Sequence, residues 1–180
     1  MIIQRLLPER NHDIQDEMPT IECTIVEVVV FKKSKGAPLY LMLRRSSTEK
    51  LYPDTWQIVT GTIETGESAL TAALREVDEE TSLQIRKFWS VPALDLFFDV
   101  KSDSVQLCPL FAGEVDGDAV PTLSEEHQHF RWVGIEEAFK SLVWPGHHKA
   151  IETVHQFIVA EREAARLTEI NHAIVERKSL

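Results

Sequence analysis

The chain of 180 residues is long enough for one domain with a sizeable hydrophobic core and short for two. Its content of 43% hydrophobic and 27% charged residues is ordinary for a globular protein. The formal net charge of −10 argues against a nonspecific nucleic-acid surface and against an anionic-membrane surface, so we expect neither partner. No run of about 18 apolar residues exists, and the N-terminus turns acidic after a brief apolar patch, so we expect neither a membrane span nor a signal peptide.

Residues 1–18 carry mixed charge, and we expect them to form an N-terminal extension to a single domain with a C-terminal helix over residues 19–180. Both cysteines, Cys23 and Cys108, lie in apolar runs that are typical of strands. We therefore expect buried, reduced thiols and a cytoplasmic location, with a disulfide as the alternative.

Two strands joined by a turn open the predicted domain. Residues 20–33 are rich in β-branched side chains, and residues 39–45 follow a turn that contains Gly36. Arg44 and Arg45 end the second strand on opposite faces, so at most one of them points into a given cleft. An inward guanidinium suits a phosphate group, so both arginines are candidate substrate contacts, with two solvated arginines as the alternative.

A short strand, a glycine-containing loop and a helix follow in succession. The strand is expected over residues 56–59, and the helix from about Ser68, its N-cap, to about Thr81. At about 100° per residue, one narrow stripe of this helix must face a core. The stripe consists of Leu70, Ala73, Leu74, Val77 and Thr81.

Acidic side chains gather on another face of this helix. Glu76, Glu79 and Glu80 are helical neighbours, and like charges at this spacing repel one another. A Mg²⁺ ion that binds carboxylate oxygens and a substrate phosphate would offset the repulsion; a solvated acidic face is the alternative. Arg75 can hold Glu79 as an i,i+4 pair. The loop before the helix adds two further acids, Glu64 and Glu67.

Strands and helices continue through the second half of the chain. The pattern predicts two strands joined by a polar turn, another strand and a short helix, at residues 84–100, 104–115, 130–133 and 135–142. From about His147 a final helix begins, which either continues or breaks and resumes towards the C-terminus. These elements together predict an α+β fold.

Two neighbouring aromatic residues in the first of these strands, Phe97 and Phe98, point to opposite faces. One of them is expected to pack in the core while the other lines a pocket. We take Phe98 as the candidate substrate contact.

The loop and acidic helix resemble the Nudix box, G-x(5)-E-x(7)-R-E-U-x-E-E-x-G-U, where U is a bulky aliphatic residue. Ser82 departs from the pattern, because a glycine that ends the helix normally stands there. The resemblance implies the Nudix fold, an α/β/α sandwich around a mixed β-sheet, and hydrolysis of a phosphoanhydride bond. The matching positions are Gly61, Glu67, Arg75, Glu76, Val77, Glu79, Glu80 and Leu83.

The resemblance implies that the acidic helix binds Mg²⁺, or Mn²⁺ as the alternative. We expect Glu76 and Glu80 to be the principal ligands, with Glu79 sharing a metal and the Gly61 carbonyl completing the shell. Arg75 is expected to orient Glu79. The expected partner is a small molecule linked through a nucleoside diphosphate.

A second group of residues, distant in sequence from the box, is similar to a Nudix subgroup that acts on dihydroneopterin triphosphate and dATP. The shared segments are W-Q-x-V-T-G, which begins at Trp56, and E-H-x-x-[YF]-x-W-U, which begins at Glu126. The resemblance implies that Glu126 is the general base, with a solvated loop carboxylate as the alternative. His127 either contacts a phosphate or orients the loop.

The sequence therefore predicts Mg²⁺-dependent cleavage of dihydroneopterin triphosphate or a deoxynucleoside triphosphate to a monophosphate and pyrophosphate. Dinucleoside polyphosphates, ADP-ribose and sugar nucleotides are alternative substrates, because the box does not set specificity. A nucleotide sensor without catalysis is a third reading, which the complete set of box acids disfavours. We expect a monomer or a homodimer, and the tail beyond Arg166 is a candidate dimer contact.

Overall fold

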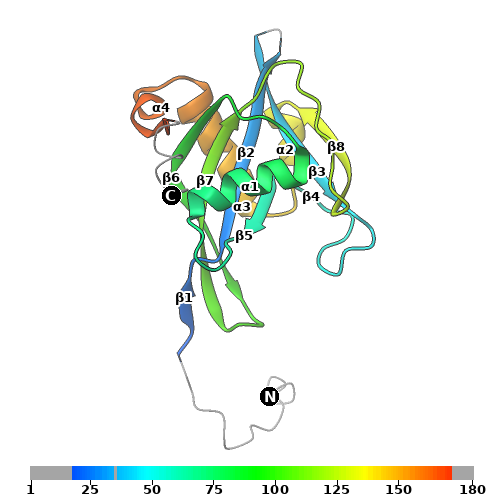
Figure 1. The fold of residues 1–180 in the computed structure, drawn as a ribbon, viewed down its shortest axis with the longest axis vertical. Coiled ribbons are helices and arrows are strands. Elements are labelled where there is room, and N and C mark those ends of the chain that lie inside the picture. The colour runs from blue at the N-terminus through cyan, green and yellow to red at the C-terminus, as the bar shows by residue number, and fades with distance from the viewer. Residues whose placement is uncertain (1–17, 35, 172–180) are drawn as a thin grey trace, which may run out of the picture.

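The computed structural model describes residues 18–34 and 36–171 (Figure 1). The predicted N-terminal extension therefore lies almost entirely outside the described residues, as does the end of the C-terminal tail. Within the described part of the chain, no helix has the length and apolar character needed to cross a bilayer.

The strands are β1 (Thr20–Glu22), β2 (Ile25–Ser34), β3 (Ala37–Arg45), β4 (Trp56–Gln57), β5 (Val59–Thr62), β6 (Lys87–Asp99), β7 (Ser104–Glu114) and β8 (His127–Val133). The helices are α1 (Ala69–Thr81), α2 (Ile135–Ser141), α3 (Pro145–Thr153) and α4 (Glu163–Thr168), and a π-helical segment, Val154–Val159, follows α3.

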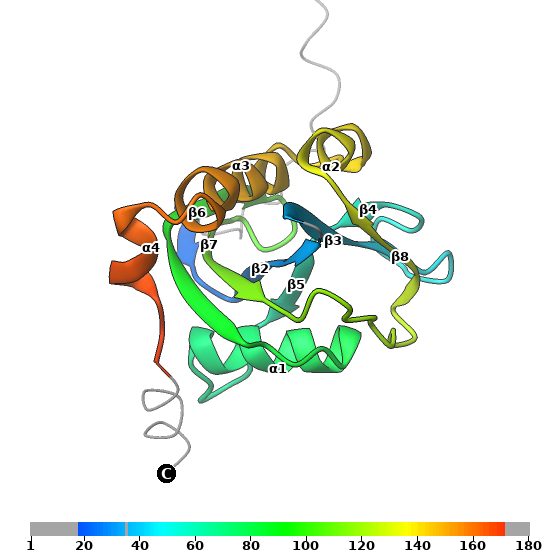
Figure 2. The same cartoon turned by 90° about the horizontal axis from the view of Figure 1, so that it is seen from above.

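The strands form one mixed sheet in the order β1-β7-β2-β3-β4, to which β5 adds on β2, β6 on β7 and β8 on β3. Strands β1 and β2 run parallel to β7, and the other pairs are antiparallel. Helix α1 covers one face of the sheet, and α2 and α3 cover the other (Figure 2). The α+β class and the α/β/α sandwich are thus confirmed.

Alternation along β2 divides the core into two layers. Val26, Val28 and Val30 pack under α1, whereas Val29 and Phe31 pack on the side of α3. All five side chains are fully buried, because a central strand is covered on both faces. This core fixes β2 and β5 beneath the acidic helix.

The predicted first strand is broken near Cys23. From Glu22 to Glu27 the chain advances five residues, while their partners on β7, Gln106 and Leu110, are only four residues apart. The extra residue interrupts the pairing, as a bulge does. Cys23 is exposed there, so the prediction that it is buried was wrong, while Cys108 is buried and both thiols are free.

The final helix breaks and resumes, which was one of the two expected outcomes. Helix α3 runs into the π-helical segment, and the chain then turns at Glu161, whose φ is 53°, before α4 begins. The hairpin of β2 and β3 and the hairpin of β6 and β7 are confirmed.

Candidate active site

Helix α1 begins and ends where its sequence predicts. The Ser68 hydroxyl accepts a hydrogen bond from the Thr71 backbone N–H at 3.2 Å, which makes Ser68 the N-cap. Ser82 ends the helix in the left-handed region, with φ 52° and ψ 23°. Serine therefore stands at a position whose backbone favours glycine, and it adopts the conformation that the glycine of the box would adopt.

Gly61 allows the backbone of β5 to lie directly against the helix. A Cβ at this position would overlap the carboxyl group of Glu76. The Glu76 carboxyl group therefore lies directly against the β5 backbone, and a larger residue at position 61 would force this side chain to move.

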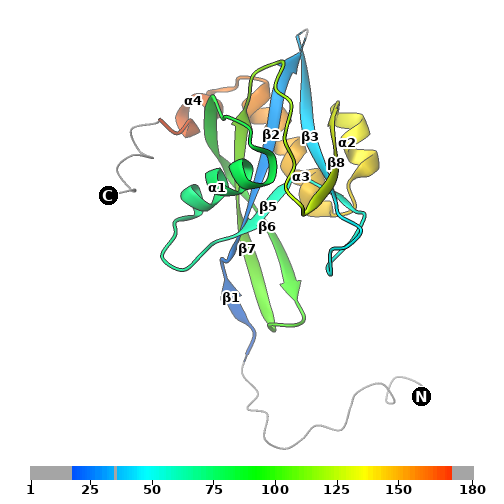
Figure 3. The same ribbon diagram turned by 45° about the vertical axis from the view of Figure 1, so that its right-hand side comes forward.

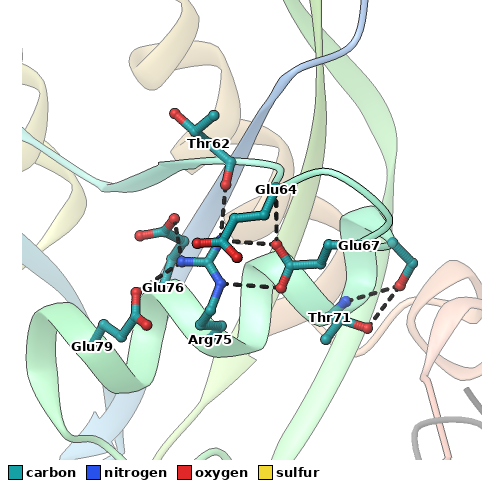
Figure 4. Close-up of polar contacts among 8 residues, drawn as sticks. Thr62, Glu64, Glu67, Thr71, Arg75, Glu76 and Glu79 are labelled. Carbon is teal, nitrogen blue, oxygen red and sulfur yellow. Dashed lines mark hydrogen bonds and ion pairs between the residues drawn. The ribbon is translucent and has the colours of Figure 1, made fainter. Parts of the chain in front are cut away.

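Arg75 links the loop, the strand and the acidic face through its guanidinium group (Figure 4). Its Nε and Nη2 donate to the two carboxylate oxygens of Glu67 at 3.1 and 2.9 Å, and Nη2 also donates to the Thr62 carbonyl at 2.8 Å. Its Nη1 donates to Glu76 and Glu79, each at 2.8 Å. The predicted pair of Arg75 and Glu79 is confirmed, and the bidentate pair with Glu67 adds a fixed geometry.

Glu67 and Glu64, the two acids of the loop, make different contacts. Hydrogen bonds from Arg75 lower the pKa of Glu67 below its ordinary value and raise the pKa of the Arg75 guanidinium. The backbone N–H of Glu64 donates to Glu67 at 3.1 Å, while the Glu64 side chain is exposed. Glu67 therefore holds the arginine in place, and Glu64 contributes through its backbone.

Beyond the arginine, the charges of Glu76, Glu80 and Glu126 act on one another. Glu80 is only 3% exposed, and burial raises its pKa well above the ordinary value, with the charges of Glu76 and Glu126 raising it further. Burial also raises the pKa of Glu76, against the lowering effect of Arg75. Glu126 thus lies close enough to both helical acids to act on them, although 46 residues separate it from Glu80.

This cluster fits a hard cation. The Oε2 atom of Glu80 is buried and has no hydrogen-bond partner, and a buried carboxylate requires a positive partner or a proton. Across residues 18–34 and 36–171, no three His, Cys, Asp or Glu side chains form a ready metal cage. Mg²⁺ does not need one, because it is commonly held by one or two carboxylates together with waters and substrate phosphates.

A second buried contact approaches Glu80 from β8. The Nδ1 atom of His127 lies 3.9 Å from Glu80 Oε2, and both side chains are almost completely buried. On the other side of the ring, His127 Nε2 lies 3.2 Å from Nε2 of Gln57, which also donates to the Thr60 hydroxyl at 3.3 Å. Burial, helped by the charge of Arg45, lowers the pKa of His127 to about 4, so the imidazole is neutral.

The two arginines of β3 already have local partners. Arg44 donates from Nη2 to the Asp54 carboxylate at 3.0 Å, and Arg45 donates from Nη2 to Glu49 at 2.9 Å and from Nε to the Leu51 carbonyl at 2.9 Å. Both arginines therefore hold the loop between β3 and β4. Arg45 is the one whose charge reaches the site, since it acts on the pKa values of Glu80 and His127.

The geometry of the loop and helix agrees with a comparison of the whole chain with known families. The family model described as the NUDIX domain matches residues 24–156. The chain belongs to the Nudix family. Membership makes it a hydrolase of phosphoanhydride bonds, and a divalent metal is general in such enzymes.

Individual relatives of this Nudix chain carry different names. It is 33% identical over 129 residues to the dihydroneopterin triphosphate diphosphatase of Haemophilus influenzae, covering 63% of this chain and 75% of that one. It is 28% identical over 143 residues to a bis(5'-nucleosyl)-tetraphosphatase of Rattus norvegicus, covering 78% and 86%. It is 31% identical over 144 residues to an octanoyltransferase of Myxococcus xanthus, covering 76% of this chain but spanning only 37% of that protein.

Solved structures support the Nudix fold. The structure of an Ap4A hydrolase binary complex from C. elegans superimposes with a TM-score of 0.64, at 19% identity, over 77% of this chain and 99% of that one. At this identity the likeness shows the fold alone.

Gln57 and Phe98 differ from the other residues considered for the Nudix site. Gln57 was not predicted as a site residue, although it belongs to the W-Q-x-V-T-G segment, which was the available signal. Phe98 is half-exposed opposite Val105, near the tip of the β6–β7 hairpin, which extends beyond α1 (Figure 3). Its assignment as a substrate contact stays a prediction.

Proposed function

We propose that the protein hydrolyses dihydroneopterin triphosphate or a deoxynucleoside triphosphate to the monophosphate and pyrophosphate with Mg²⁺, Mn²⁺ being the alternative metal. The observation that carries the proposal is the buried Glu80 carboxylate, whose Oε2 has no partner and lies beside Glu76 and Glu126. The 33% identity to the Haemophilus influenzae diphosphatase supports the substrate class. The W-Q-x-V-T-G and E-H segments are the parts of the sequence that resemble this subgroup.

Four groups would hold the metal: the carboxylates of Glu76, Glu79 and Glu80, and the Gly61 carbonyl. When bound, Mg²⁺ neutralises phosphate charge and lowers the pKa of water. Arg75 donates to Glu76 and Glu79, so it sets the positions of two of the four groups.

Glu126 is proposed as the general base that takes a proton from the attacking water. Its position supports this role, because its charge acts on both Glu76 and Glu80 while its side chain is exposed to solvent. An exposed carboxylate at the edge of the acidic cluster can pass the proton to bulk water.

Positive charge for the transferred phosphates is proposed to come from Arg45 more than from Arg44. Arg45 is the less exposed of the two, with a side chain at 16% against 36%, and its charge reaches the acidic cluster. His127 is neutral and buried, so we assign it to the positioning of Glu80.

A second candidate substrate is a dinucleoside polyphosphate. The match to the rat bis(5'-nucleosyl)-tetraphosphatase favours it, because it covers 78% of this chain and 86% of that protein. The acidic helix serves both substrates equally, since the cleaved bond is a phosphoanhydride in each case.

Product analysis separates these candidates. The purified chain would be incubated, with and without Mg²⁺, with dihydroneopterin triphosphate, the four deoxynucleoside triphosphates, diadenosine tetraphosphate and ADP-ribose. Metal-dependent release of pyrophosphate and a monophosphate from a triphosphate supports the proposal. Preferential cleavage of diadenosine tetraphosphate or ADP-ribose refutes the substrate class but keeps the family chemistry.

A matched variant shows whether the measured activity comes from this protein or from a contaminating phosphatase. Glu80→Gln keeps the shape of the side chain and removes its charge, so we expect turnover to fall by orders of magnitude while the circular dichroism spectrum is unchanged. Normal turnover in a folded Glu80→Gln variant refutes the metal assignment.

A further inference from the structure

Strands β6 and β7 extend beyond α1 as a long hairpin, with β1 beside them (Figures 1 and 3). Cross-strand partners share a face of the sheet, which places Phe98, Val105 and Ile21 in one row and Leu96 and Leu107 in the next. We call this surface the arm face. Its residues are Ile21, Leu94, Leu96, Phe98, Val105, Leu107 and Pro109.

The arm face continues the buried side of the sheet. Val105, Leu107 and Pro109 alternate along β7 with the same phase as Phe111, which lies in the core under α1. Beyond α1 this side is open: Ile21 is 73% exposed and Leu96 is 64% exposed. The same surface that is covered in the body of the molecule is therefore uncovered in the arm.

Strand β6 contributes apolar side chains alone to the arm face. Leu94, Leu96 and Phe98 lie on the arm face, whereas Asp95, Phe97 and Asp99 lie on the opposite face, so Phe97 interrupts the alternation of apolar and polar residues. The opposite face of the arm is mixed, because it holds the exposed Phe97 beside polar residues. It carries a hydrogen-bonded group formed by Glu22, Ser102, Ser104 and Gln106. The arm thus exposes to solvent a side that carries apolar residues alone.

We propose that the arm face packs against the arm face of a second copy of this chain in a two-fold symmetric dimer. The four most exposed residues of the arm face offer roughly 500 Å² of accessible surface, which is as large as the largest apolar patch of an ordinary monomer. They are Ile21, Leu94, Leu96 and Phe98. Two copies would bury roughly 1,000 Å² from these side chains alone, which meets the minimum for a specific interface before any neighbouring residue contributes.

The uncharged character and the width of the arm face favour a second copy. Two chains with a formal charge of −10 repel each other, but no residue of the arm face is charged, so a contact there buries no charge. Three strands wide, the face matches an identical flat sheet face. A single extended peptide segment would cover the width of about one strand.

Sedimentation equilibrium of the full chain, over a broad range of concentration, tests the proposal. We expect a dimer for the wild type and a monomer for Leu96→Glu, which places a charge in the middle of the face. The control is Leu167→Glu, because Leu167 is 78% exposed on α4, beside the tail that is the other candidate dimer contact. This variant should remain dimeric.

Three results would overturn the proposal: a monomeric wild type, a Leu96→Glu variant that stays dimeric, or a Leu167→Glu variant that becomes monomeric. If Leu96→Glu fails to fold, Ile21→Glu on the neighbouring strand repeats the test at a more exposed position. Removal of residues 1–17 should leave the dimer intact, and a monomer after this truncation refutes the sheet-to-sheet contact. The readout is mass, so it is independent of any substrate.

Discussion

Gln57 and His127 are 70 residues apart in sequence, and their side chains meet in the interior with 3.2 Å between Gln57 Nε2 and His127 Nε2. The amide nitrogen of Gln57 only donates, so Nε2 of the imidazole must be the acceptor and the ring proton must sit on Nδ1. The Nδ1 atom that carries this proton lies 3.9 Å from Glu80 Oε2, and neither atom has a hydrogen-bond partner. Gln57 thus determines which tautomer faces the acidic cluster.

Replacement of Gln57 by glutamate should reverse this tautomer. A carboxylate at position 57 accepts a hydrogen bond, so the proton moves to Nε2 of His127 and a lone pair faces Glu80. We expect the nitrogen-15 chemical shifts of the two ring nitrogens to exchange their pattern, and kcat to fall about 10-fold or more. Gln156→Glu, at an exposed glutamine, is the control and should change neither quantity. An unchanged nitrogen-15 pattern in Gln57→Glu contradicts the assignment.

Glu80 should lower the stability of the metal-free protein in a pH-dependent way. Its pKa is raised, so the folded protein binds more protons than the unfolded chain above the ordinary value of 4.5. The contribution of Glu80 to the free energy of unfolding therefore falls as pH rises through this window. Glu80→Gln removes that loss, and its advantage over the wild type in EDTA should grow from pH 4.5 upwards.

Urea denaturation of both proteins at several pH values measures this difference. The comparison with the wild type is needed because His127, whose pKa is lowered to about 4, contributes with the opposite sign between its folded value and its ordinary value of 6.5. A Glu80→Gln variant that is less stable than the wild type at every pH would falsify the account of Glu80 as a strained acid. Excess Mg²⁺ should narrow the gap, since only the wild type binds it well.

Gly61→Ala should inactivate the protein through one methyl group. The new Cβ would overlap the Glu76 carboxyl group, so the Glu76 side chain, an expected metal ligand, must move away from its position. A displacement of about 1 Å at a reacting centre can cost about 100-fold in rate, and we expect a loss of at least this size in kcat/KM. Gly134→Ala is the matched control, because its Cβ would meet no atom within 4 Å. Equal activity of the two variants would contradict the steric argument.

Ser82→Gly should stabilise the protein without changing its activity. The residue has φ 52°, which glycine adopts without the steric cost that a Cβ imposes. We expect a gain of about 0.5–1 kcal/mol in the free energy of unfolding and a rise of about 1–4 °C in Tm. Ser141→Gly, at the last residue of α2, should instead lower stability. A lower free energy of unfolding in Ser82→Gly would contradict the view that serine at this position of the box carries a steric cost.

Local patterns by themselves determined the helix α1, its caps at Ser68 and Ser82, and the ion pair of Arg75 with Glu79. Each depends on residues within one or two turns of the helix, where spacing fixes geometry. The hairpins were likewise predictable, because alternation and a turn define them without reference to the rest of the chain.

Only the tertiary structure decided which distant groups meet. The position of Glu126 beside Glu76 and Glu80 and the contact of Gln57 with His127 depend on how β8 and β4 pair with β3. The bulge that exposes Cys23 comes from the register of two strands on β7, which no local pattern records. The same holds for the arm face: Leu94, Leu96 and Phe98 fall on one side of β6 by their spacing, but only the extent of α1 determines that this side is left uncovered.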